Sequence, residues 1–140
     1  MRTLLLALLP LALTACDSAS PIARPGEVSA YGVTFRVDRT EVRRGDAVEL
    51  ALVNDSDAVV QTGVFGCDVV ERLVDDAWVQ READNDRACI LPIVSVSPGK
   101  SYEGAFVVDV APGTVRLKHT FFVDDDGTAT LASPPIRVLR

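Results

Sequence analysis

Residues 44–56 decide the fold, and they read RGDAVELALVNDS. Apolar residues recur at every second position of this stretch, and a period of two is typical of a half-buried β-strand. The stretch opens on a turn around Gly45 and closes on the polar cluster of residues 54–57. Because turn residues of this kind interrupt strands, the stretch predicts one strand of a sheet that covers an apolar core.

Similar alternating or β-branched runs recur along the chain, with turn signals between them and no helical period. They lie at residues 33–37, 59–65, 68–74, 77–81, 93–96, 102–110, 115–123, 128–131 and 136–139. Valine is abundant and aromatic residues are few, which favours an aliphatic β-core. The pattern predicts an all-β protein, a single antiparallel sandwich of about seven to nine strands over residues 30–140.

Two local signals refine this expectation. Asp75 and Asp76 stand alone between two β-rich runs, so a two-residue hairpin turn is expected there, although the glycine that would strengthen it is missing. Pro134 and Pro135 interrupt the last part of the chain, because proline cannot donate to a β-ladder. The run at 136–139 is therefore expected to resume pairing at a sheet edge.

The first fifteen residues have the layout of a secretory signal peptide. Arg2 supplies a positive start, and residues 4–13 form an apolar run that Pro10 interrupts. This run is about half the length that a membrane-spanning helix needs. Residues 1–15 are therefore predicted to be a signal peptide that is removed on export.

The end of this segment, Leu13-Thr14-Ala15-Cys16, resembles the lipobox of bacterial lipoproteins. The resemblance implies that the Cys16 thiol is lipidated, that the chain is cut before it, and that the new amino group is usually acylated. Residues 16–29 are then a lipidated N-terminus and a flexible tether, with Pro21 and Pro25 in it. The expected location is the bacterial cell envelope, on the periplasmic or extracellular face, with the inner and outer membranes both open. The alternative is an ordinary signal peptide with an incidental cysteine.

A second resemblance concerns the domain itself. The pattern of Gly45-Asp46, alternating residues and then Asn54 resembles the opening of bacterial Ig-like domains, and the turns at 98–99 and 112–114 resemble turns of that class. It implies an Ig-like or fibronectin-type fold and says little about function. A weaker likeness is to bacterial intracellular proteinase inhibitors, although no inhibitory loop is visible.

Two cysteines remain once Cys16 is assigned to lipid. Cys67 and Cys89 form an even pair in an exported protein, so a disulfide is expected. It would close a loop of about twenty residues and stabilise the fold by roughly 3 kcal/mol. A metal-binding pair is the alternative, but the spacing of a zinc site is absent.

Several charged or polar groups are candidate sites. The formal net charge of −6 argues against nucleic acid as a partner. His119, the sole histidine, is in phase with Leu117 and Phe121 and is expected to pack rather than to act. Calcium binding and solvated turns are both open for the acidic loops at Asp84 and Asp86 and at Asp124, Asp125 and Asp126. Arg39, Arg43 and Arg44 are expected to pair with nearby acids, or else to meet lipid phosphates.

The chain thus predicts a lipid-anchored envelope protein whose domain is a binding or structural module, without a cofactor or catalytic group. Its partners would be the membrane, through Cys16, and an unknown envelope protein. The Cys67–Cys89 segment with Trp78 is the expected binding surface, since these folds recognise partners at loop tips and sheet edges. The alternatives are a protein inhibitor or accessory subunit of an envelope complex, and a calcium-dependent adhesion-like module.

Overall fold

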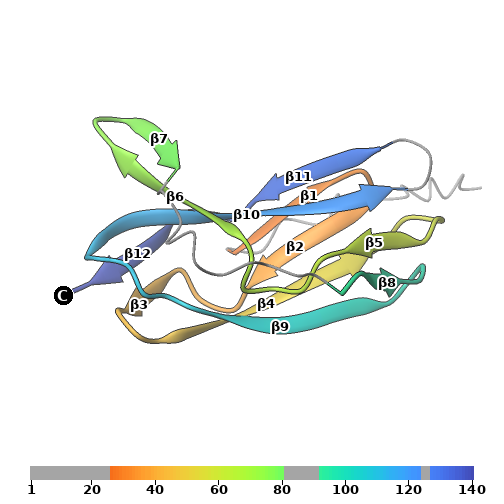
Figure 1. The fold of residues 1–140 in the computed structure, drawn as a ribbon, viewed down its shortest axis with the longest axis horizontal. Helices are drawn as coiled ribbons and strands as arrows, with labels where there is room; N and C mark the ends of the chain where they lie inside the picture. The colour runs from red at the N-terminus through yellow and green to blue at the C-terminus, as the bar shows by residue number, and fades with distance from the viewer. Residues whose placement is uncertain (1–25, 81–91, 124–126) are drawn as a thin grey trace, which may run out of the picture.

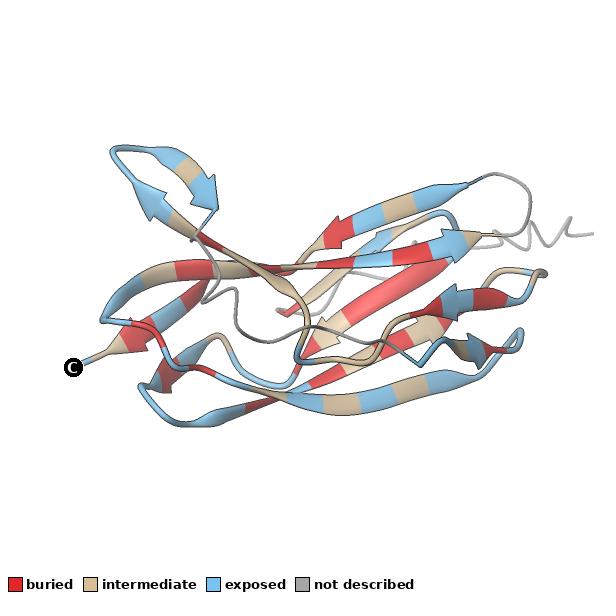
Figure 2. Cartoon of the chain, in the orientation of Figure 1, coloured by how far each residue is buried: buried red, intermediate tan, exposed pale blue. Residues whose placement is uncertain are grey.

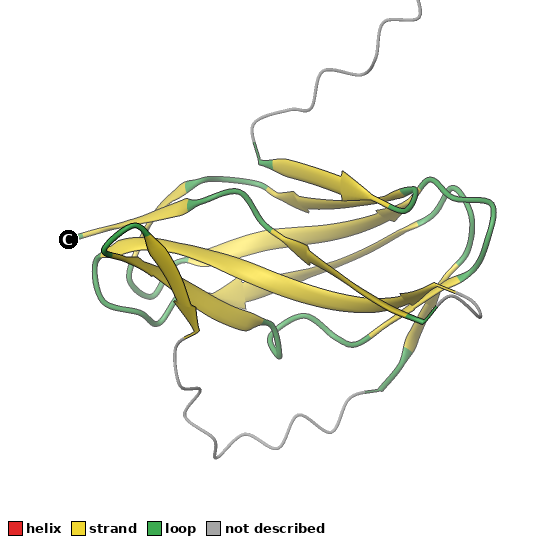
Figure 3. Cartoon of the chain, turned by 90° about the horizontal axis from the view of Figure 1, so that it is seen from above, coloured by secondary structure: helices red, strands yellow, loops and turns green. Residues whose placement is uncertain are grey.

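A computed structural model of the chain describes residues 26–80, 92–123 and 127–140. These residues form strands and turns without a helix (Figure 3), and the strands lie in two sheets (Figure 1). The predicted all-β sandwich is confirmed, but the described residues form twelve strands rather than the expected seven to nine. The strands are β1 (Glu27–Ala30), β2 (Val33–Val37), β3 (Glu41–Arg43), β4 (Ala47–Asn54), β5 (Val60–Thr62), β6 (Val69–Val74), β7 (Ala77–Gln80), β8 (Val94–Val96), β9 (Ser101–Val107), β10 (Gly113–Val123), β11 (Thr128–Ala132) and β12 (Ile136–Leu139).

The first sheet has the strand order β1-β2-β4-β9, and all its pairs are antiparallel. The alternation read from the sequence of β4 is reproduced, since its inward residues are buried and its outward ones are less so. The turn before β4 has Gly45 at φ +90°, a conformation that glycine adopts without steric cost. The strand predicted within residues 44–56 is therefore β4, a central strand of this sheet.

The second sheet is organised around the long strand β10. One edge of β10 pairs with β11 and then β12, and the other edge pairs with β5 and then β6. The break between β11 and β12 falls at Ser133 and the two prolines, as expected. The predicted edge position of β12 is wrong, because β3 adds to its outer side in parallel. A three-residue strand with one apolar residue gave no signal in the sequence.

The core lies between the sheets and is mostly aliphatic (Figure 2). Each buried valine, leucine, isoleucine or phenylalanine contributes about 1.5–3 kcal/mol relative to an exposed one, whereas an exposed ion pair contributes about 0–1 kcal/mol. The sheets are therefore held together by this core rather than by surface charges. Its largest fully buried hydrophobic side chains are Phe35, Phe121, Leu52, Leu117 and Ile136.

The predicted hairpin at residues 75 and 76 is confirmed. Strands β6 and β7 pair in register from Val74↔Ala77 to Glu71↔Gln80. Asp75 and Asp76 have φ of +48° and +62°, which is the left-handed pair that a type I′ turn requires. Aspartate tolerates this region better than most residues, so the turn forms without glycine.

Strands β5 and β1 also differ from the expectation. Strand β5 ends at Thr62, not at residue 65, because Phe65 turns inward and packs against Tyr102 with ring centroids 4.9 Å apart. Strand β1 was not predicted, and it takes in the last three residues of the segment assigned to the tether, Glu27 to Ser29. Its hairpin with β2 turns at Tyr31 and Gly32, both with positive φ.

Candidate functional site

The β6–β7 hairpin projects beyond the body of the sandwich (Figure 1). The ladder between β6 and β10 runs only from Val69 to Arg72, so Leu73, Val74 and the turn lie beyond the last paired residue. Arg72 fixes the base, because its Nη2 donates to the carbonyl oxygens of Ala111 at 2.5 Å and Pro112 at 2.6 Å. The root of the hairpin is therefore anchored while its tip is exposed (Figure 2).

One face of the hairpin carries Trp78, which is half-buried. Trp78 lies opposite Leu73 in the register, and the guanidinium carbon of Arg116 stands 4.4 Å from the centroid of its ring. Arg116 also donates to Glu71 Oε2 at 2.6 Å, and Lys118 Nζ lies 3.2 Å from Glu71 Oε1. Cation–π contact and ion pairing thus hold the tryptophan against β10.

The Glu71 carboxyl responds to two opposed effects. Burial raises its pKa, but the hydrogen bonds from Arg116 and Lys118 outweigh burial and leave the pKa of Glu71 below its usual range. Glu71 therefore stays ionised at neutral pH and keeps both cations on the Trp78 face.

The other face of the hairpin borders an apolar groove of about 250 Å³. Val74 is 45% exposed and Val79 is 50% exposed on this face. The far wall comes from the segment that precedes β10. The groove is lined by Val70, Arg72, Val74, Val79, Val110 and Val115, among others. Exposed aliphatic side chains around a hollow are a feature of surfaces that meet a partner.

A buried polar network lies deeper in the sandwich. His119 is 4% exposed, and its Nε2 and Nδ1 lie 2.5 Å from Thr62 Oγ1 and 2.5 Å from Asp68 Oδ1. The Asp68 side chain is 0% exposed. Phe35 and Phe65 flank the imidazole with centroid distances of 5.6 and 4.7 Å. The expected packing role of His119 on the apolar face is confirmed.

The three groups stand in the order of a nucleophile, a base and an acid, but all three side chains are buried. The Thr62 side chain is fully buried, and neither of the two cavities described is lined by Thr62 or His119. A neutral imidazole donates from Nδ1 to Asp68 and accepts from Thr62. An imidazolium donates to both, while the Thr62 hydroxyl donates to the carbonyl of Gly63 at 3.2 Å. The neutral ring with its proton on Nδ1 and the imidazolium therefore both keep the two partners of His119.

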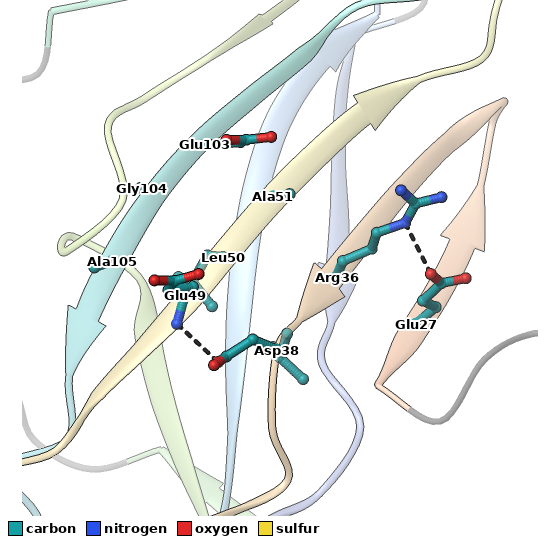
Figure 4. A pocket seen from close by; sticks show the side chains of 10 residues that line it. Glu27, Arg36, Asp38, Glu49, Leu50, Ala51, Glu103, Gly104 and Ala105 are labelled. Atoms are coloured by element: carbon teal, nitrogen blue, oxygen red, sulfur yellow. Dashed lines mark hydrogen bonds and ion pairs between the residues drawn. The ribbon is translucent and has the colours of Figure 1, made fainter.

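The outer face of the first sheet holds a broad, shallow hollow of about 690 Å³ (Figure 4). Its rim is acidic, since Asp38, Glu49 and Glu103 border it together with the pair Glu27–Arg36. Arg36 Nε lies 2.9 Å from Glu27 Oε1, without the geometry of a hydrogen bond. Small alanine side chains form the floor, so this face is a smooth acidic surface rather than a built site.

Some of the other candidate residues from the sequence lie in the described part of the chain and others do not. Arg39 pairs with Asp38 and Arg44 with Asp109, as the sequence suggested for these arginines. Cys67 lies half-buried between β5 and β6, whereas Cys16, Cys89 and both acidic loops (84–86, 124–126) lie outside the described residues. The lipid anchor, the disulfide and calcium binding thus stay predictions. In the described ranges, no group of three or more metal-ligating side chains forms and no helix is long and apolar enough to cross a membrane.

Two members of the buried network were missed by the sequence analysis. Thr62 shares the inward phase of Val60, and a polar residue in an apolar phase is a usable signal for a buried hydrogen bond. Asp68 carried no such signal, because it lies in a loop and meets a histidine 51 positions away.

No family model matches this chain, and no curated protein matches it either. Among solved structures it is similar to a Northeast Structural Genomics Consortium target, SoR45, with 11% identity, a TM-score of 0.45, and coverage of 79% of this chain and 88% of that one. It is also similar to a β-glucosidase from Listeria innocua, solved in complex with gluconolactone, with 14% identity, a TM-score of 0.33 and coverage of 76% of this chain. The match spans 16% of the glucosidase, and neither likeness bears on function.

Proposed function

We propose that this protein is a lipid-anchored component of the bacterial envelope that binds a partner protein through the β6–β7 hairpin. The observation that carries the proposal is the projecting hairpin itself. Its two faces expose Leu73, Val74 and Val79, and an exposed hydrophobic surface on a monomer marks an interaction site. Trp78 adds a large, restrained aromatic side chain of the kind that dominates binding surfaces.

The anchor and the disulfide complete the proposal. The lipobox resemblance assigns a lipid to Cys16, and the acyl chains of a processed lipoprotein suffice for stable anchoring. The Cys67–Cys89 disulfide would close the base of the segment that carries the hairpin. Replacing Cys16 by alanine is expected to release the protein from the membrane fraction, and continued sedimentation with membranes would contradict the anchor.

Binding is tested by capture from envelope extracts with a pair of matched variants. Val79→Ser removes an exposed valine from the hairpin, while Val107→Ser removes one that is 60% exposed on β9 in the other sheet. A partner retained by the wild type and by Val107→Ser, but lost by Val79→Ser, is the expected result. Equal retention by both variants would refute the hairpin as the binding surface.

The identity of the captured protein separates two kinds of module. A protease whose activity falls when the full chain binds it would assign the hairpin to the inhibitor alternative. A structural or assembly protein would assign it to an accessory role. Both outcomes use the same exposed side chains.

A further inference from the structure

The free edge of β7 is the least protected strand edge around the hairpin. Within the described residues β7 pairs with β6 alone. Its sequence, AWVQ over Ala77–Gln80, contains no charged residue and no proline. Sheet edges are normally blunted by charges, prolines or bulges, because an open edge is a template for another strand.

The hairpin register shows which backbone groups face this edge. The two-residue turn closes on the pair Val74↔Ala77, and in such a hairpin the closing pair exchanges both hydrogen bonds. Hydrogen-bonded pairs then alternate along the ladder, so Val79 also bonds to β6. The N–H and C=O groups of Trp78 and Gln80 therefore point outward, toward the open edge.

The chemistry around the edge selects the occupant. A strand added beside β7 places every second side chain on the Val79 face, where the groove of about 250 Å³ accepts small aliphatic groups. The turn at the tip carries Asp75 and Asp76, both exposed. A basic side chain on the incoming strand would meet these two carboxylates.

A second copy of the chain fits this edge poorly. Each chain carries a formal charge of −6, so two copies repel one another.

From these observations we propose that β7 accepts an extended segment of a partner protein as an added strand. The segment has aliphatic side chains in one phase and a basic residue near the hairpin tip. This inference rests on the proposed function and specifies how the hairpin binds.

The test uses the full chain and a fluorescently labelled synthetic octapeptide, Lys-Thr-Val-Thr-Val-Thr-Val-Thr. Binding is followed by anisotropy, and the site by the amide NMR shifts of β7. Gln80→Pro removes one outward N–H without touching the β6 ladder, and Gln80→Thr is its matched control. Loss of one net hydrogen bond is expected to weaken binding about three- to tenfold for Gln80→Pro, and less than about twofold for Gln80→Thr.

A second arm keeps the test valid if Gln80→Pro unfolds. The same peptide with its edge-facing amides N-methylated is expected to lose binding to the wild type, and a glutamate in place of its lysine is expected to weaken binding. Strand addition is overturned if the octapeptide causes no shift at millimolar concentration, or if the methylated peptide binds equally well. A concentration-dependent dimer that Gln80→Pro abolishes would overturn it in favour of a second copy.

The two proposals fail in different ways. Partner capture that is lost by Val79→Ser but kept by Gln80→Pro would refute strand addition and leave the hairpin as the binding surface. Capture that is insensitive to both variants would refute the proposed function.

Discussion

Replacing His119 by phenylalanine removes both ring nitrogens but keeps a ring between Phe35 and Phe65. Within the described residues, the carboxylate of Asp68, fully shielded from solvent, then keeps the 3.1 Å hydrogen bond from the backbone N–H of Gly66 and no other. Removing the hydrogen-bond donor of a buried charged group costs at least about 1–3 kcal/mol, because the desolvated carboxylate is left without compensation. We expect His119→Phe to lower the free energy of unfolding by about this amount.

Because this loss comes from a buried charge without a partner, the substitution Asp68→Asn is expected to destabilise the wild type but to stabilise the His119→Phe variant. In the wild-type background, Asp68→Asn weakens the contact with His119 and is expected to cost about 1–3 kcal/mol. In the His119→Phe background the same substitution removes the uncompensated charge. There it is expected to restore about 1–2 kcal/mol.

Urea unfolding followed by far-UV circular dichroism measures all four proteins of this cycle at pH 7. Glu41→Gln is the control, since its ion pair with Arg137 is exposed and its loss is expected to matter by less than about 0.5 kcal/mol. Thr62→Val gives a milder version of the perturbation, with an expected cost of about 1–3 kcal/mol. An Asp68→Asn effect of the same sign and size in both backgrounds would refute the coupling of Asp68 to His119.

Three further outcomes are expected. The lowered pKa of Glu71 contributes stability above its unfolded pKa of about 4.3, and that stability is lost as the pH falls through the folded pKa. Glu71→Gln should therefore flatten the loss of unfolding free energy between about pH 5 and pH 3. If the unfolding free energies of the wild type and of Glu71→Gln fall in parallel with pH, the ion pairs of Glu71 do not stabilise the fold. A Cβ at Gly104 would lie 2.8 Å from the Phe65 ring, so Gly104→Ala should cost about 1–3 kcal/mol in thermal or urea unfolding, and much less in a Phe65→Leu background. Thiol titration of the unreduced, denatured protein should find neither Cys67 nor Cys89 reactive, and two reactive thiols would exclude the disulfide.

The strands that the sequence predicted best are those whose own residues determine their burial. In β4 and β10, apolar residues occupy alternate positions over eight and eleven residues, and that period alone orients the strand. Strands β1 and β3 have four and three residues and carry no comparable pattern. They pair because β2 and β12 offer open edges beside them, which is a property of the assembled sheets.

The candidate site also has one part that the local sequence predicted and another part that depends on the assembled sheets. The two-residue turn predicted the hairpin, and the position of Trp78 drew attention to it, but the sequence did not show that the hairpin would project. Projection depends on where β10 begins: the register Val115↔Arg72 would place Gly113 opposite Val74, and the chain turns away from the sheet just before Gly113. Arg72 then holds that turn through the carbonyls of residues 111 and 112. Because this geometry joins two segments about forty positions apart, local periodicity contains no trace of it. The open edge of β7 is likewise a property of the assembled sheet, since β7 lies on the outer side of β6 and nothing else in the described ranges pairs with it.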